Sequence, residues 1–355
     1  MKQQKPTIGG QAVLEGVMMR SPEHMAIAVR KEDGQLVTRV SPVVNPAKKT
    51  PFFGWPLVRG VVSFVQSMAI GVKTLSQAAD MLGIEEDQPT RFEKALAKAT
   101  GKKTEDIMMF FAVVVAVALA VGLFIFLPSL AVTAMRAAIE NRLLVNMLEG
   151  ALRLCIFFGY MLLVGLVPDI GRTFAYHGAE HKVVMTYEQD GELTVERCRQ
   201  SSRFHPRCGT SFLFLVMAIS ILCFSLLPIS GNVFLRSGTR LLLMPFVAGI
   251  SYEILKAVAK SDNLFTRIVR APGLWTQRIT TREPDDAMIE VAIASFNAAL
   301  TGQLPEEADV TETAEPAPSE TTETENASPE SLEVDATPPK SHEVAEVAEV
   351  AEETA

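Results

Sequence analysis

One uncharged stretch restricts the folds open to this chain more than any other feature of its sequence. Residues 107–127, IMMFFAVVVAVALAVGLFIFL, contain no charged side chain. Because an α-helix rises about 1.5 Å per residue, a helix of this length crosses a hydrocarbon core of roughly 30 Å. The hydrophobic content of 48% is high for a wholly soluble protein. We therefore predict a multi-pass membrane protein.

Three other stretches are apolar enough to be considered as spans. Residues 151–167 and 211–227 are close to the lower length limit of a transmembrane helix, and residues 239–258 are apolar at their start but include Pro245, Glu253 and Lys256. Residues 57–82 have apolar positions interrupted by polar ones, a pattern typical of an amphipathic helix at the interface or packed on the bundle. The expected fold class is mainly α, a polytopic helical bundle of about four spans.

The distribution of basic residues predicts how this bundle is oriented. Residues 91–106 contain five Lys or Arg and residues 169–210 contain six, whereas residues 128–150 contain two and residues 228–238 contain one. Because basic loops stay in the cytoplasm, we expect the 169–210 loop and both termini to be cytoplasmic, in a bacterial inner membrane. The N-terminus has no apolar core typical of a secretory signal. On this reducing side, no disulfide between Cys198 and Cys208 is expected.

Two short segments have the sequence pattern of β-hairpins. Residues 25–40 and residues 182–197 each place an Asp-Gly pair between two stretches of strand-forming residues. We expect a small cytoplasmic β unit assembled from both parts of the chain. Residues 302–355 differ in kind, because they contain 16 acidic residues, one lysine and few large apolar side chains. Such a segment cannot bury enough surface to offset its chain entropy, so a disordered acidic tail is predicted.

These expectations give the following domain organisation: an N-terminal β-rich cytoplasmic segment at 7–50, an amphipathic or interfacial helix at 55–83, a membrane bundle at 107–258 that includes the cytoplasmic loop at 169–210, a cytoplasmic helical segment at 259–300, and the disordered tail at 302–355.

The motif that bears most on function is YHGAEHK, residues 176–182. His177 and His181 are four residues apart and Glu180 lies between them, so a helix places all three on one narrow face. The order H-x-x-E-H is the inverted zincin pattern, in which two imidazoles hold zinc and the glutamate polarises a water molecule. The alternative is a helix end near the bilayer, with Glu180 paired to Lys182 or Arg172.

A second cluster strengthens the metal hypothesis. His205 and Cys208 are three residues apart in the polar loop CRQSSRFHPRCGT, and Pro206 favours a turn between them. Imidazole and thiolate donors together select zinc or a similar transition metal rather than magnesium or calcium. The less favoured additional ligands are Cys198, which could be an ordinary strand-end residue, Glu253, which could instead pair with Lys256, and Glu15, which follows the Gly9-Gly10 pair.

Other classes of function have less support. Cys155 and Cys223 fall in apolar runs and are expected to be small buried hydrophobes. The basic residues flank apolar segments without interleaved aromatics, so no nucleic-acid partner is predicted, and the lipid bilayer is the partner that they fit. No phosphate-binding loop, serine elbow or dinucleotide fingerprint is present.

Four separated motifs together resemble an uncharacterised bacterial integral membrane family, a domain of unknown function catalogued as predicted metal-dependent enzymes. These motifs are IGGQAVLEGVMMRSP, YHGAEHK, HPRCGTSF and APGLWTQRITTREP, and the resemblance covers about residues 7–300. The resemblance implies a multi-pass membrane protein with a metal site carried by His177, Glu180, His181, His205 and Cys208. It does not supply a reaction.

Three functions are compatible with these observations. The first is an inner-membrane metalloenzyme, hydrolytic and using zinc, with His177, His181 and either His205 or Cys208 as ligands and Glu180 as general base. The second is a noncatalytic scaffold in which four His and Cys ligands stabilise the 169–210 loop for a protein partner. A transporter is the third, suggested only by Glu253 and Lys256. The number of protein ligands distinguishes the first two, since three favour an enzyme and four a structural site.

Overall fold

The computed structural model describes residues 5–43, 51–84, 104–135, 139, 141–189, 191–227, 232–258, 261 and 263–304. All of these residues belong to one compact unit, Met1–Ala314. The predicted disordered tail lies outside the described residues from position 305 onward.

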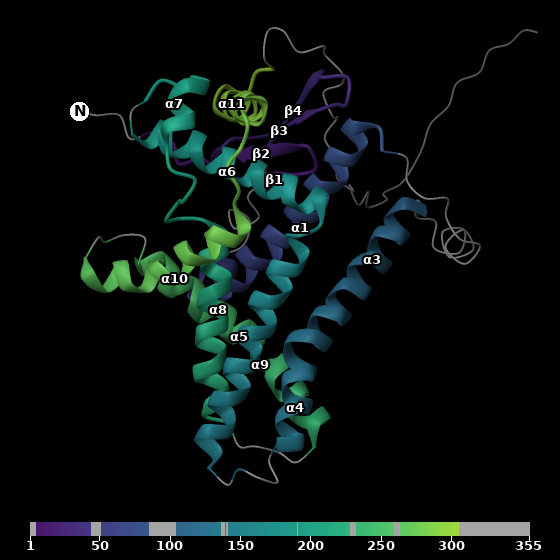
Figure 1. Ribbon diagram of the computed structural model, residues 1–355, viewed down its shortest axis with the longest axis vertical. Coiled ribbons are helices and arrows are strands. Elements are labelled where there is room, and N and C mark those ends of the chain that lie inside the picture. Colours follow the sequence, from purple (N-terminus) through teal and green to yellow (C-terminus); the bar gives the residue numbers. More distant parts are fainter. Residues whose placement is uncertain are drawn as a thin grey trace, which may run out of the picture. The chain divides into compact units, whose positions relative to one another are not determined.

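A small antiparallel sheet is formed entirely by the N-terminal part of the chain (Figure 1). Its strand order is β1-β2-β3-β4, so every strand pairs with its neighbour in sequence. The predicted hairpin at 25–40 is present as β3 and β4, with Val29 opposite Val37 and Gly34 at a φ of 86° in the connecting turn. The strands are β1 (Gly9–Val13), β2 (Gly16–Arg20), β3 (His24–Arg30) and β4 (Leu36–Pro42).

The predicted second hairpin at 182–197 is wrong. Helix α6 (Pro168–Glu188) continues through its first half, and the short helix α7 (Val195–Gln200) contains its last three residues. Ala175, Ala179 and Val183 recur every four residues, and all three are buried in one core with the sheet. Residues 182–186 favour a strand by local preference, but the buried helical spacing overrides it, because tertiary packing decides between helix and strand.

Both faces of the sheet are covered, and successive side chains of each strand point to opposite faces. Val17 and Met19 point to one face, where α6 and α11 (Asp286–Thr301) complete the core. Met18 points to the other face, where it packs with Ala78 and Met81 of α1 (Val58–Leu82). The sheet therefore holds α6 on one face and the end of α1 on the other.

Within the described residues, three helical segments are long and apolar enough to cross a membrane: Ile107–Ala134, Leu144–Val164 and Val233–Val258. The first combines α3 (Thr104–Val121), η3 (Gly122–Phe126) and α4 (Leu127–Met135), the second lies in α5 (Arg142–Val164), and the third is α9. The span predicted at 211–227 corresponds to α8 (Gly209–Ser225), which is apolar but shorter. The short helix η2 (Pro51–Gly54) precedes α1, and α10 (Leu264–Thr280) follows α9.

A buried charged cluster links the helices of this apolar part. Glu149 of α5 accepts hydrogen bonds from Arg240 Nη2 of α9 at 2.8 Å and from the Ser129 hydroxyl of α4 at 2.9 Å. Arg153 Nη2 lies 3.6 Å from the same carboxylate, and Arg153 Nε donates to the Phe124 carbonyl. Glu149 is 2% exposed. The negative charge of Glu149 therefore lies between two buried positive charges, those of Arg153 and Arg240.

Candidate metal centre

Three donor atoms converge beside α6. His177 and His181 lie one turn apart on this helix, with their ring centroids 4.4 Å apart. Cys208 is the N-cap of α8, a position at which the helix dipole favours a negative charge. One ligand atom from each of these three residues lies within 4.8 Å of the others. The i, i+4 spacing of the histidines and the turn before α8 therefore meet at one point.

The outer nitrogens of both imidazoles have defined partners. His177 Nδ1 donates to the Thr280 carbonyl at 2.9 Å, and His181 Nδ1 donates to the Arg203 carbonyl at 2.5 Å. In a neutral imidazole this leaves the Nε2 lone pair free to bind a metal. His177 Nε2 lies 3.3 Å from Cys208 Sγ, and His181 Nε2 is buried without a hydrogen-bond partner in the described structure. That unpartnered atom fits a metal ligand.

The charges of the site agree with this assignment. Burial and the neighbouring His177 lower the pKa of His181 to about 3, so its imidazole is neutral at physiological pH. Burial also lowers the pKa of His177, but the hydrogen bond to Cys208 and the charges of Cys208 and Glu180 outweigh it and raise the pKa to about 9. Cys208 and Glu180 thus favour a positive charge beside them, which a metal ion bound at His177 would supply.

Glu180 stands beside the three donors with one oxygen held in place. Its Oε1 accepts a hydrogen bond from the Gly10 amide at 3.0 Å, and its Oε2 lies 3.9 Å from His177 Nε2. Burial raises the pKa of Glu180. A side chain at position 10 would place Cβ 2.3 Å from the Met18 carbonyl and 3.2 Å from Glu180 Cγ. The backbone at Gly10 therefore approaches Glu180 closely and positions its carboxylate.

A cavity of about 460 Å³ opens onto the donors. Its walls come from β1, α6, the loop before α8 and the first turns of α8. The lining residues nearest to the chemistry are His177, Glu180, His181, His205 and Cys208, with Leu213 contributing an apolar surface. A small substrate could therefore reach a metal ion held by His177, His181 and Cys208.

His205 lines the cavity but does not join the three donors. Its Nε2 lies 3.4 Å from a Glu188 carboxylate oxygen, and its Nδ1 accepts from the Arg207 amide at 3.3 Å. Its ring centroid is 5.7 Å from that of His181. Both ring nitrogens thus have other partners. The structure brings together three of the four ligands favoured from the sequence.

The less favoured ligands lie elsewhere. Cys198 is buried in the core shared by the sheet, α6 and α11. Glu15 forms an ion pair with Arg172 and has a φ of 46°, a left-handed conformation that is uncommon for a side chain other than glycine. Glu253 accepts a hydrogen bond from Arg59 Nε at 2.6 Å. None of the three approaches the donor cluster.

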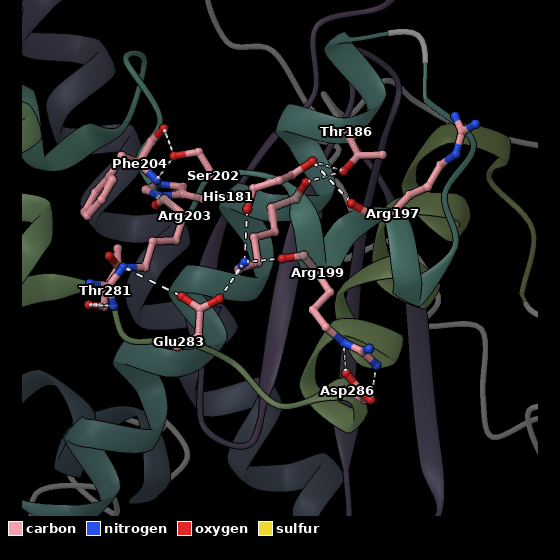
Figure 2. A network of polar contacts seen from close by, with 12 residues as sticks. His181, Thr186, Arg197, Arg199, Ser202, Arg203, Phe204, Thr281, Glu283 and Asp286 are labelled. Atoms are coloured by element: carbon pink, nitrogen blue, oxygen red, sulfur yellow. Dashed lines mark hydrogen bonds and ion pairs between the residues drawn. The ribbon is translucent and has the colours of Figure 1, made fainter.

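Lys182, the last residue of the motif, has a role that the sequence did not suggest. Its amine is buried and donates to the carbonyls of Arg199 at 2.7 Å and Ser201 at 3.0 Å. It also forms an ion pair with Glu283 at 2.6 Å. Figure 2 shows this network between α6 and the segment that carries the carbonyl partner of His181, the backbone of Arg203. Lys182 therefore fixes the position of that segment.

Gly178, between the two histidines, marks a further contact. A Cβ at this position would lie 2.1 Å from the Arg282 carbonyl. A glycine inside a helix between two potential ligands indicates a close backbone approach, so this signal was present in the sequence. The approaching segment includes Thr280, whose carbonyl holds His177. Because every residue has a backbone carbonyl, the sequence does not indicate which carbonyl accepts the hydrogen bond of His177.

Comparison with known proteins identifies relatives but no activity. Residues 55–302 match the model of a family described as "Protein of unknown function (DUF1385)". The chain is 33% identical over 303 residues to "Uncharacterized protein YqhQ" of Bacillus subtilis (strain 168), covering 83% of this chain and 92% of that protein. No solved structure matches.

Proposed function

This chain belongs to the DUF1385 family of unknown function, and we propose that it is a zinc-dependent hydrolase of the bacterial inner membrane. One observation carries the proposal: three donors, His177, His181 and Cys208, converge at the wall of a cavity that Glu180 also lines. Catalytic zinc sites characteristically use three protein ligands and leave one position open, whereas structural sites are closed by four.

The residues divide into distinct roles. His177, His181 and Cys208 would hold the metal, which supplies a Lewis acid and lowers the pKa of bound water. Glu180 Oε2 faces the same space and would accept the proton of the attacking water, then return it to the leaving group. The Gly10 amide holds Oε1 and so fixes the direction of the second oxygen. The carbonyls of Thr280 and Arg203 keep the histidines in the required tautomer.

The membrane location rests on the apolar helices. Three segments of the described chain are long and apolar enough to cross a bilayer, which suggests a membrane protein. Because the basic residues concentrate in the 91–106 and 169–210 segments, we place the site and both termini at the cytoplasmic face. A topology reporter fused at residue 190 tests this orientation, and its appearance outside the cytoplasm would reverse it.

The alternative is a structural metal site that organises a surface for a protein partner. It is favoured by His205, which lies close to the donors and could complete a four-ligand set if it moved away from Glu188. In that arrangement the open position would disappear. The two proposals therefore differ in the coordination of the metal rather than in its presence.

Cobalt substitution distinguishes them. Cobalt(II) bound in place of zinc reports its coordination through visible absorption, and a hydroxamate added from solution can bind only to an open position. The enzyme proposal expects a shift of the cobalt bands on hydroxamate addition and an unchanged starting spectrum in His205→Ala. The structural proposal expects no response to hydroxamate and a changed spectrum in His205→Ala. Glu180→Gln is the matched variant, expected to keep the metal because Glu180 is not a ligand.

A further inference from the structure

Helix α10 exposes a continuous apolar face. Leu264, Ile268 and Trp275 are 75%, 62% and 69% exposed, and Phe265 beside them is 69% exposed. At 3.6 residues per turn, positions 264, 268 and 275 fall on one stripe of the helix. This stripe contacts little of the described protein, so something outside it is expected to cover these side chains.

The opposite face of α10 packs on the protein. Thr266, Gly273 and Gln277 are buried. A Cβ at position 273 would lie 2.3 Å from the Ser211 hydroxyl, so α10 and α8 are in close backbone contact. Figure 1 shows α10 running across α8 rather than alongside it. The helix is therefore anchored by one face and exposed by the other.

Basic residues occupy one flank between these two faces. The sequence of α10, LFTRIVRAPGLWTQRIT, contains three arginines and no acidic residue. At 3.6 residues per turn, Arg267, Arg270 and Arg278 all fall on the same side of the helix, next to the exposed stripe. Arg270 is half-buried and donates to the carbonyls of Val258 and Ser261, whereas Arg267 and Arg278 are exposed. An apolar stripe bordered by arginines and carrying a tryptophan is typical of helices that lie in the plane of a membrane surface.

We propose that α10 is an in-plane membrane helix that binds an anionic lipid surface. The face formed by Leu264, Ile268 and Trp275 enters the boundary between headgroups and acyl chains, and the exposed Arg267 and Arg278 contact anionic headgroups. With 17 residues, three arginines and Pro272 inside the helix, α10 is not suited to cross the bilayer. The arginine border favours lipid over a second copy of this apolar face, because two such faces would bring like charges together.

The same helix holds two residues of the metal centre from behind, outside the wall of the cavity. The Thr280 carbonyl at its last turn accepts from His177 Nδ1. Gln277 exchanges two hydrogen bonds of 2.8 Å with the backbone of His205. A bilayer that holds α10 in place therefore also holds the outer partners of the site, and the metal centre lies at the level of the lipid headgroups.

The two tryptophans of the chain make this proposal directly testable. Trp55→Phe leaves Trp275 as the only tryptophan, so its emission reports the position of α10 in the full-length protein. The protein is placed in nanodiscs of phosphatidylcholine and phosphatidylglycerol, in which the lipids are brominated either near the headgroup or near the methyl end of the acyl chain. Trp275→Phe, which keeps Trp55, is the control that removes the α10 signal.

We expect bromine near the headgroup to quench Trp275 more strongly than bromine near the methyl end. We also expect phosphatidylglycerol to reduce quenching by aqueous acrylamide relative to phosphatidylcholine alone. Stronger quenching by the deep bromines would overturn the in-plane arrangement. Quenching by acrylamide but by neither brominated lipid would show that Trp275 faces water. Protection from all three quenchers would show that a protein surface covers it. Either result would overturn the lipid as partner. None of these results depends on metal or on activity, so this inference and the proposed function can fail separately.

Discussion

Replacing Lys182 by methionine should destabilise the fold around the metal centre. The lysine side chain is 3% exposed and its amine holds two backbone carbonyls, those of Arg199 and Ser201. Methionine keeps much of the apolar stem and its packing but has no donor. The carbonyls would then be left in a buried setting without their charged partner.

The size of the effect follows from these contacts. A hydrogen bond from a charged donor contributes roughly 1.5–3 kcal/mol. The ion pair with Glu283 adds less than about 1 kcal/mol, since that carboxylate is 63% exposed and screened by water. Allowing for the retained apolar stem, we expect a loss of about 3 kcal/mol. In a domain of this size that corresponds to a fall of roughly 6–12 °C in the midpoint of thermal unfolding.

Thermal unfolding of the purified protein in mild detergent measures this fall. Lys73→Met is the matched control, because Lys73 is exposed on α1 and should leave the midpoint unchanged. We also expect faster loss of bound metal in Lys182→Met, because the Arg203 carbonyl that orients His181 lies in the released segment. Equal midpoints for Lys182→Met, Lys73→Met and the wild type would show that Lys182 does not fix this segment.

Two further substitutions test other parts of the structure. Gly178→Ala should cost about 1–3 kcal/mol by overpacking against the Arg282 carbonyl, whereas Gly159→Ala, with open space around its Cβ, should not lower the thermal midpoint; equal midpoints would place the 282 segment away from α6. Glu149→Gln should cost about 3–5 kcal/mol because buried Arg240 loses its carboxylate, and a normal yield and thermal midpoint in detergent would argue against that pairing.

The local geometry of the site could be predicted from the sequence where it depended on spacing along one element. His177 and His181 share a helix face because they are four residues apart, and Cys208 reaches them from the loop that Pro206 bends. The sequence favours His205 as a ligand equally well, but in the structure it is held by Gln277 and Glu188, two partners from other segments. Long-range contacts of this kind decide which of several suitable residues meet, and spacing does not encode them.

The fold shows the same limit. The hairpin at 25–40 forms as expected because its turn and its alternating side chains agree. Residues 182–188 carry a similar pattern, yet they are helical because Val183 belongs to the buried stripe of α6. The span at 107–127 can be predicted from its length and its lack of charged side chains, whereas the arrangement of α10 across α8 depends on the contact of Gly273 with Ser211.

The most direct test of the metal centre is the zinc content of the protein purified in mild detergent without chelators, measured per chain by elemental mass spectrometry. His181→Ala is compared with the wild type, and Cys223→Ala, which alters a cysteine outside the donor cluster, is the control. We predict about one zinc per chain in the wild type and in Cys223→Ala, and its loss in His181→Ala. A wild type without metal, or a His181→Ala variant with unchanged zinc, would contradict the assignment of this site.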